Sequence, residues 1–223
     1  MAIKNFTMTP LISKKFDASA YFNEALFESE NFKVIPSLGS LVEGWLLIVP
    51  KNHYISFGHI EDTALYEEAQ FVLEYVCQKV KSIYGDLVVF EHGAIDCGSV
   101  VGCGVDYAHI HIVPVSVDLQ TESQRYIADI LWTDYPSLEH TKYFVASGSS
   151  YLLLKTDENN FKIGVSENIP SQTFRKIIAE KIGLKDEFDW KKYFFENNIL
   201  KTINQFKSFN KKIIVPKLKP DLL

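Results

Sequence analysis

Apolar positions in the first half of the chain follow two periods, and together they predict a mixed α and β fold. Runs of strand length lie at residues 25–30, 32–35, 45–49 and 86–91. Apolar residues recur at helical spacing over residues 65–83, where Asp62 can cap the helix and Gly85 can end it. A turn at Glu30 and Asn31 makes the first two strands a hairpin. This order predicts an α+β fold, with an antiparallel sheet and helices packed on it.

The second half of the chain has a different pattern, which begins after Val117. We expect strands at residues 142–146, 151–155 and 161–165, and a turn at 157–160. We expect helices at residues 123–132, at 171–182 with Ser171 as the cap, and from Asp189 towards Phe206. No linker rich in Gly, Ser and Pro divides the halves, so we expect them to pack directly. The predicted organisation is an N-terminal arm (1–21), an α+β domain (22–117), a C-terminal α/β extension packed on it (118–210) and a loose basic tail (211–223).

Residues 107–114 are the segment most suited to catalysis, because histidines alternate there with apolar residues. The segment reads Tyr-Ala-His-Ile-His-Ile-Val-Pro. In a strand, His109 and His111 point to the same face as Tyr107, and the Ala and Ile residues point to the other. Neighbouring imidazoles can supply a nucleophile towards phosphorus and a proton for the leaving group. A single histidine would favour a structural role, but this pair indicates a catalytic face.

A glycine-rich connection, residues 93–104, leads into the histidine segment. Gly98, Gly102 and Gly104 would let the backbone approach a ligand closely and direct N–H groups at it. Amides in this arrangement suit a phosphate and stabilise the charge that develops on it in the transition state. The chain has no GxxxxGK[ST] motif, so this connection is not a P-loop. It predicts either phosphate contacts or a plain flexible loop.

A metal site is the competing interpretation of the histidines. The available ligands would be His109 and His111 with His92, Cys97, Cys103 or Asp106. Their spacing matches no closed zinc motif, so we expect no metal and no other cofactor.

Charge and cysteine content narrow the classes of protein. The 223 residues carry a formal net charge of −5, whereas sequence-independent binding to nucleic acid needs a basic surface. The three cysteines include no CxxC pair, and with no signal peptide they indicate reduced thiols in a cytoplasm. No apolar run is long enough to span a bilayer. We therefore expect a cytoplasmic protein with neither nucleic acid nor membrane as a partner.

Two separated motifs resemble the histidine triad (HIT) family. Residues 44–53, Gly-Trp-Leu-Leu-Ile-Val-Pro-Lys-Asn-His, are similar to the strand before the long helix of that family. Residues 107–113 are similar to its signature, His-φ-His-φ-His-φ-φ, and the order of elements agrees over residues 22–117. The resemblance implies a nucleotide-binding α+β fold. It also implies that the middle histidine attacks the α-phosphate of a nucleotide conjugate and forms a nucleotidyl-histidine.

The resemblance also implies roles for individual residues. His109 falls on the nucleophile and His111 on the third histidine, while Tyr107 replaces the first and would have to substitute through its hydroxyl. Trp45 stands at a position that is often histidine. The phosphate-facing loop falls on Gly102, Cys103 and Gly104, and Ser37 lies near the usual ribose contact.

A longer branch of the superfamily provides a further resemblance, carried by residues 90–93, 102–106, 170–175 and 189–190. It implies that the second half closes over the site. The substrate contacts that it adds are Glu91, His92, Gln172 and Arg175. The alternative is a solvated helix face for Gln172 and Arg175 and a surface histidine for His92.

Two functions remain open. The first is a HIT-type hydrolase or transferase that acts on a nucleoside monophosphate conjugate, such as a dinucleoside polyphosphate or a nucleoside phosphoramidate. In it His109 is the nucleophile, His111 orients it and assists proton transfer, and Tyr107 hydrogen-bonds within the site. Histidine at position 111 favours a hydrolase by the same resemblance. The second is a catalytically weak module that binds nucleotides or a protein on the same scaffold, which the loss of the first histidine favours. Short HIT proteins form dimers; here the extra half could replace the second subunit, so we expect a monomer.

Overall fold

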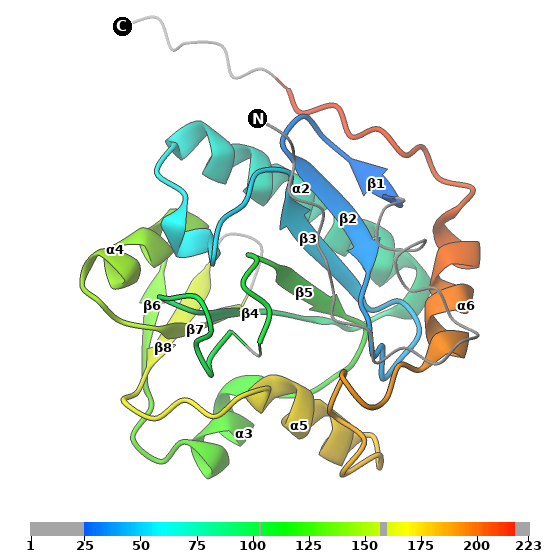
Figure 1. The fold of residues 1–223 in the computed structure, drawn as a ribbon. Helices are drawn as coiled ribbons and strands as arrows, with labels where there is room; N and C mark the ends of the chain where they lie inside the picture. The colour runs from blue at the N-terminus through cyan, green and yellow to red at the C-terminus, as the bar shows by residue number, and fades with distance from the viewer. Residues whose placement is uncertain (1–24, 103, 157–159, 217–223) are drawn as a thin grey trace, which may run out of the picture.

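In the computed structural model the chain forms one eight-stranded sheet with helices on both faces (Figure 1). The structure describes residues 25–102, 104–156 and 160–216, so the expected arm at 1–21 lies outside the described residues. The strands are β1 (Phe27–Glu28), β2 (Phe32–Pro36), β3 (Leu46–Pro50), β4 (Val88–Gly93), β5 (Ile110–Val113), β6 (Leu131–Tyr135), β7 (Tyr151–Lys155) and β8 (Phe161–Val165). Their order in the sheet is β1-β2-β3-β5-β4-β7-β8-β6, and all of these neighbours are antiparallel. The predicted α+β class is confirmed.

The helices lie in two layers, one on each face of the sheet (Figure 1). The α-helices of the described residues are α2 (Thr63–Tyr84), α3 (Leu119–Tyr126), α4 (Thr141–Ala146), α5 (Thr173–Lys181) and α6 (Glu196–Phe206). The described residues also form two 3₁₀ turns, η1 (Phe57–His59) before α2 and η2 (Leu138–His140) before α4. None of these helices is long and apolar enough to cross a membrane.

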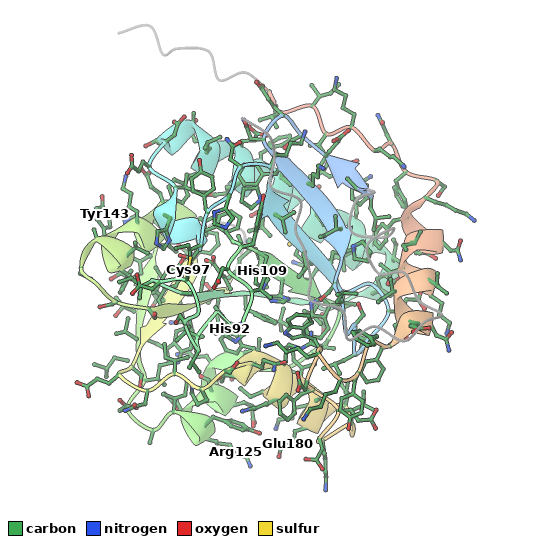
Figure 2. The ribbon with its side chains drawn as sticks, viewed as in Figure 1. His92, Cys97, His109, Arg125, Tyr143 and Glu180 are labelled. Carbon is green, nitrogen blue, oxygen red and sulfur yellow. The ribbon has the colours of Figure 1, made fainter. Side chains whose placement is uncertain are left out.

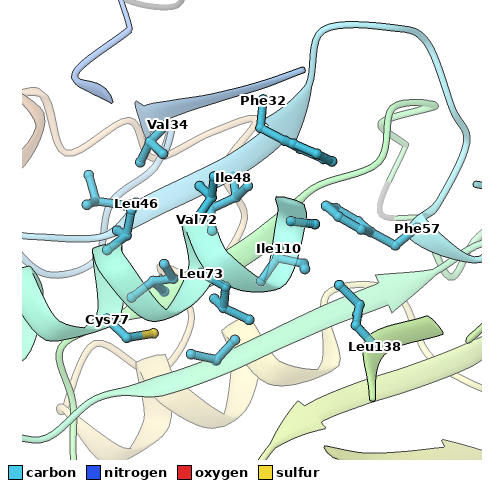
Figure 3. Close-up of a cluster of buried hydrophobic side chains, with 14 of the residues drawn as sticks. Phe32, Val34, Leu46, Ile48, Phe57, Val72, Leu73, Cys77, Ile110 and Leu138 are labelled. Carbon is cyan, nitrogen blue, oxygen red and sulfur yellow. The ribbon is translucent and has the colours of Figure 1, made fainter. Parts of the chain in front are cut away.

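One face of the sheet packs on α2, as the helical spacing of residues 65–83 predicts. The Asp62 carboxylate accepts a hydrogen bond from Ala64 N at 2.9 Å, and Gly85 ends the helix with φ +85°. The buried side chains of this layer come from the helix and the strands together (Figure 3): Val34, Ile48, Val72, Leu73 and Ile110. Their removal from water is the main stabilising contribution on this side of the sheet.

The opposite face of the sheet is covered by α5 and α3 from the second half of the chain. Phe174 and Ile178 of α5 are buried in one cluster with Trp45 and Phe90 of the first half. β7 also pairs directly with β4, from Phe90↔Leu154 to Gly93↔Tyr151. The second half therefore continues the sheet of the first half and supplies a helical layer over it.

Two elements of the second half differ from the prediction. Residues 142–146, expected as a strand, belong to α4, which contacts Gly58 of η1 through Val145 and the Thr141 carbonyl. This packing outweighs the strand propensity of the Tyr-Phe-Val run. The helix expected at 123–132 already ends at Tyr126, because residues 131–135 pair with β8 as the edge strand β6.

Helix starts and the tail also differ from the prediction. The residue before α5 is Gln172, not Ser171, and no side chain caps it. α6 begins at Glu196 rather than near Asp189, whose carboxylate instead accepts a local hydrogen bond from Lys191 N at 3.1 Å. The predicted loose tail is wrong at its start, because Ile213 is buried and its N–H donates to the Glu28 carbonyl at 2.7 Å. Most of the turn expected at 157–160 lies outside the described residues.

The close packing of Gly93 on β4 against Tyr151 on β7 gives a stability prediction. A Cβ added at Gly93 would lie closer than 3.0 Å to ring atoms of Tyr151, whereas at Gly148 it would meet nothing within 4 Å. Gly93→Ala should therefore lower the free energy of unfolding by about 3 kcal/mol through overpacking. Gly148→Ala, at φ +79°, should cost only the backbone strain of about 1 kcal/mol. Urea unfolding of both variants checks this. An equal loss of unfolding free energy in the two variants would contradict the close packing of Gly93 on Tyr151.

Candidate active site

The histidine segment lies in the middle of the sheet, between β3 and β4. His111 on β5 pairs with Leu47 on one side and with Phe90 on the other. His109 precedes β5, and its ring centroid is 4.8 Å from that of His111. The two rings therefore lie side by side on one face, as the alternation predicts. Figure 2 shows His109 and His92 near the centre of the molecule, on the side where α5 lies.

His109 presents one ring nitrogen as a possible nucleophile. Its Nδ1 lies 2.6 Å from the carbonyl oxygen of Tyr107. Because a carbonyl only accepts, Nδ1 must donate its hydrogen, and the lone pair is left on Nε2. Burial lowers the pKa of His109 below its ordinary value of 6.5, partly offset by this hydrogen bond, and the Arg175 charge lowers it further. His109 is half-buried, and its lowered pKa makes the ring a neutral imidazole near neutral pH.

His111 is fixed in the opposite tautomer. The Trp45 indole N–H donates to His111 Nδ1 at 3.0 Å, so the ring hydrogen is on Nε2. The ring stacks on Phe90 with centroids 4.4 Å apart and is 5% exposed. Burial, followed by the His109, His92 and Arg175 charges, holds the pKa of His111 well below its ordinary value. This ring can donate a hydrogen bond but holds no extra proton, so the proton transfer expected of it gains no support.

His92 on β4 completes a group of three histidines. Its ring centroid lies 6.3 Å from that of His111, and the backbone N–H of Phe174 donates to its Nε2 at 3.4 Å. The hydrogen is therefore on Nδ1, which is buried and has no partner within the described part of the chain. Burial, with the His109 and Arg175 charges, lowers the pKa of His92 to about 3. The predicted site residue lies in the group, under the first turn of α5.

Tyr107 lies close to the site in sequence, but its side chain points elsewhere. The segment before Ile110 is not a strand, and the Tyr107 hydroxyl donates to the Pro50 carbonyl at 2.6 Å. His53 Nε2 lies 2.7 Å from the neighbouring carbonyl of Asp106. The described hydrogen bonds of the Tyr107 hydroxyl therefore go to carbonyls of residues 50–52 and not to the histidines expected beside it. Tyr107 instead anchors the segment before His109 to the turn after β3, and its carbonyl orients the His109 ring.

Glu91 is separated from the histidines because it alternates with His92 on β4. Its carboxylate accepts hydrogen bonds from Phe57 N at 2.8 Å and from the Tyr151 hydroxyl at 2.7 Å, on the face that packs on η1. The Tyr151 oxygen in turn accepts from Gly58 N at 3.0 Å. Glu91 was expected to contact the substrate, but its carboxylate lies on the face of the sheet opposite to the histidines. Burial raises the pKa of Glu91 from 4.5 to about 7, which the two hydrogen bonds partly offset.

The glycine-rich connection keeps features that suit a phosphate. Gly104 has φ +74° and is exposed, and Gly98 N donates to the Asp106 carboxylate at 2.7 Å. Within the described residues, the N–H groups of Gly102 and Gly104 have no hydrogen-bond acceptor. Cys103, expected between them as a contact, lies outside the described residues.

Arg175 and Gln172 lie where α5 begins, next to the histidine group. Arg175 is 3% exposed, and its guanidinium lies 4.6 Å from the Trp45 ring centroid and donates to the carbonyls of Gly39 and Phe188. Its charge lowers the pKa of all three histidines. Gln172 instead contacts Asp189 and Trp190. Arg175 can thus supply a fixed positive charge, while Gln172 holds the segment that follows α5.

Ser37 does not contact the histidine group through any of its described hydrogen bonds. It follows β2, is buried, and its hydroxyl donates to the Leu38 carbonyl at 3.1 Å. Two surface hollows lie away from the histidine group. One of about 550 Å³ is lined by residues 114–118, Val42, Glu122, Lys181 and Ile182, and another lies at residues 194–198. Neither is lined by a histidine. Of the three histidines, His109 is half-buried, and the other two are buried.

Two contributors to the site were not expected from the sequence. Trp45 was noted only as a departure from the family pattern, yet it sets the tautomer of His111. The backbone N–H of Phe174 sets that of His92, and no side-chain pattern could indicate this. Among the described residues, no three His, Cys, Asp or Glu side chains are placed to hold a metal ion.

The buried Glu91 carboxyl predicts a specific pH dependence of stability. Its pKa is higher in the folded protein (about 7) than its ordinary value (4.5), so folding favours the protonated form. The stabilisation is complete below about pH 4.5 and is lost as the pH rises through 7. Glu91→Gln stays uncharged. The free energy of unfolding of the wild type minus that of the variant should therefore fall by about 3 kcal/mol over this range.

Denaturant unfolding at several pH values measures this difference. The buried neutral histidines shift stability in the opposite direction, but they do so in both proteins and cancel in the difference. A difference that stays constant from pH 4.5 to 7 would contradict the raised pKa of Glu91.

Comparisons with known proteins add little to this geometry. No protein-family model matches the chain, and no curated protein matches it. One solved structure that matches is a hypothetical histidine triad nucleotide-binding protein from Sulfolobus tokodaii strain 7, with 24% identity and a TM-score of 0.35. The match covers 41% of this chain and 59% of that one, so the chain spans less than two thirds of its length. The fold class therefore rests on the strand pairing and helix packing described above.

Proposed function

We propose that this protein cleaves nucleoside monophosphate conjugates through a nucleotidyl group held on His109. The observation that carries the proposal is the hydrogen bond from His109 Nδ1 to the Tyr107 carbonyl at 2.6 Å. It directs the Nε2 lone pair of a neutral, half-buried imidazole away from the backbone, and neutral imidazole is a good nucleophile. The similarity of residues 44–53 and 107–113 to the HIT motifs supports the same chemistry.

The reaction has two balanced steps. In the first, His109 Nε2 forms a bond to the α-phosphorus, and the bond from phosphorus to the leaving group breaks with its electron pair. In the second, water attacks the same phosphorus, the bond to Nε2 breaks, and the water gives up a proton to solvent. The products are the nucleoside monophosphate and the regenerated neutral imidazole.

Neighbouring groups would stabilise the charge on the transferring phosphoryl group. His111 Nε2–H lies on a ring whose centroid is 4.8 Å from that of His109, close enough to donate a hydrogen bond to a phosphate oxygen. The unbonded N–H groups of Gly102 and Gly104 are further donors, and Arg175 contributes a fixed charge. Tyr107 would act through its carbonyl, as a positioning residue for His109.

A binding module remains the second candidate function, because one feature of the fold favours it. His92 and His111 are 3% and 5% exposed beneath α5, so a nucleotide meets only part of the histidine group in this arrangement. A scaffold of this kind could hold a nucleotide with little turnover.

Trapping of the covalent intermediate separates the two functions. Wild-type protein mixed with diadenosine tetraphosphate, then denatured at neutral pH, should gain one adenylyl group in its intact mass. His109→Ala should lose the adduct and lower kcat by about 10³-fold or more, because the nucleophile is gone. His140→Ala, a matched change at the histidine that ends η2 and precedes α4, should keep both.

Circular dichroism should show that His109→Ala remains folded. An adduct that persists in His109→Ala would sink the assignment of the nucleophile. Saturable nucleotide binding by wild type, with no adduct and no release of monophosphate from any substrate tested, would favour the binding module instead.

A further inference from the structure

Lys191, which the sequence patterns did not single out, lies against the glycine-rich connection. A Cβ built on Gly104 would be 2.5 Å from Lys191 Nζ, so the ammonium occupies the side-chain position that this glycine leaves empty. Lys191 is exposed, and within the described part of the chain its ammonium forms no ion pair with a carboxylate. The adjacent Lys192, by contrast, lies 3.7 Å from the Asp189 carboxylate. A cation therefore borders the predicted phosphate loop from the second half of the chain.

The backbone of Lys191 is held in place by the start of α5. Lys191 N donates to the Asp189 carboxylate at 3.1 Å, and the same carboxylate oxygen accepts from Gln172 Nε2 at 3.3 Å. Trp190 N donates to Gln172 Oε1 at 3.4 Å, and the Trp190 Cβ packs on Gly39. The Gln172 amide thus holds Asp189 through its nitrogen and Trp190 through its oxygen, and Asp189 in turn holds the backbone of Lys191. Gln172 itself immediately precedes the turn of α5 that contacts His92.

The histidine group offers hydrogen-bond donors but no acid. The Trp45 donor leaves His111 with one hydrogen, on Nε2, and the Phe174 donor leaves His92 with one, on Nδ1. To donate either of these fully would leave an imidazole anion beside the substrate. A leaving group therefore has to depart without a proton from these rings. A phosphate can do so at neutral pH, because its second pKa is about 6, whereas an amine nitrogen cannot.

We propose that Lys191 binds the phosphate of an anionic leaving group, and that the site selects nucleoside phosphoanhydrides over nucleoside phosphoramidates. The inference rests on the proposed function, since it concerns the group expelled when His109 attacks. In that step the bond from the α-phosphorus to the bridging oxygen breaks, and the electron pair leaves on the departing phosphate. Lys191 Nζ and the Gly104 amide would contact its oxygens. Lys191 is thus a specificity residue supplied by the second half of the chain.

The test is the ratio of kcat/KM for diadenosine tetraphosphate to kcat/KM for adenosine 5′-phosphoramidate. We expect wild type to favour the tetraphosphate, and Lys191→Gln to lower the ratio about tenfold by removing one charge-assisted contact. Lys191→Arg keeps the charge and should keep the ratio within about threefold of wild type. Lys192→Gln removes the same net charge from the next residue and should leave the ratio unchanged, which separates a direct contact from general electrostatics.

The outcomes distinguish this inference from the proposed function. If the adenylyl adduct on His109 forms from both substrates but Lys191→Gln leaves the ratio unchanged, the inference fails and the proposed function stands. The same holds if Lys192→Gln lowers the ratio as much, or if wild type prefers the phosphoramidate. If no adduct forms from either substrate, the proposed function fails and the inference fails with it.

Discussion

The hydrogen bond between His109 Nδ1 and the Tyr107 carbonyl is the contact on which the functional interpretation depends. It decides which nitrogen of the ring carries the lone pair, and it does so with a backbone group whose position is fixed by its neighbours. The Tyr107 hydroxyl is bound to the Pro50 carbonyl at the end of β3. On the other side, His109 runs directly into β5, which is paired on both edges. The ring is thus oriented by the central strands of the sheet, and the Tyr107 side chain is part of the scaffold that holds it.

The second half of the chain is built into the same site through the pairing of β4 with β7. In residues 22–117 alone, β4 would be an edge strand of the sheet, and β7 covers this edge. This agrees with the expected monomer but does not test it. The pairing also carries α5 across the face that holds the histidines. Phe174 then packs on Phe90 and His92, and Arg175 lies over Trp45. The aromatic layer excludes water from His92 and His111, and this burial keeps both rings neutral.

The sequence predicts the first half of the fold well, because its elements are long or strictly periodic. α2 carries both of its end signals, Asp62 and Gly85, and the hairpin of β1 and β2 has one clear turn. Residues 142–146 were misassigned because a short Tyr-Phe-Val run fits a strand or a helix, and contact with Gly58 decides between them. The site is predicted in part. Alternation on β5 brings His109 and His111 together, and alternation on β4 already implies that Glu91 and His92 cannot face the same side. The tautomers could not be predicted, because they depend on the register of β3 with β5 and on a backbone amide of α5.

The most direct test of the central claim is to observe the hydrogen on each histidine ring. Long-range ¹H–¹⁵N correlation spectra of ¹⁵N-histidine-labelled protein near pH 7 distinguish the two ring nitrogens. The account predicts that His109 carries its hydrogen on Nδ1 and His111 on Nε2, and that neither ring is doubly protonated. A hydrogen on His109 Nε2, or a positively charged His109, would leave no lone pair on Nε2 for attack on phosphorus and would contradict the account.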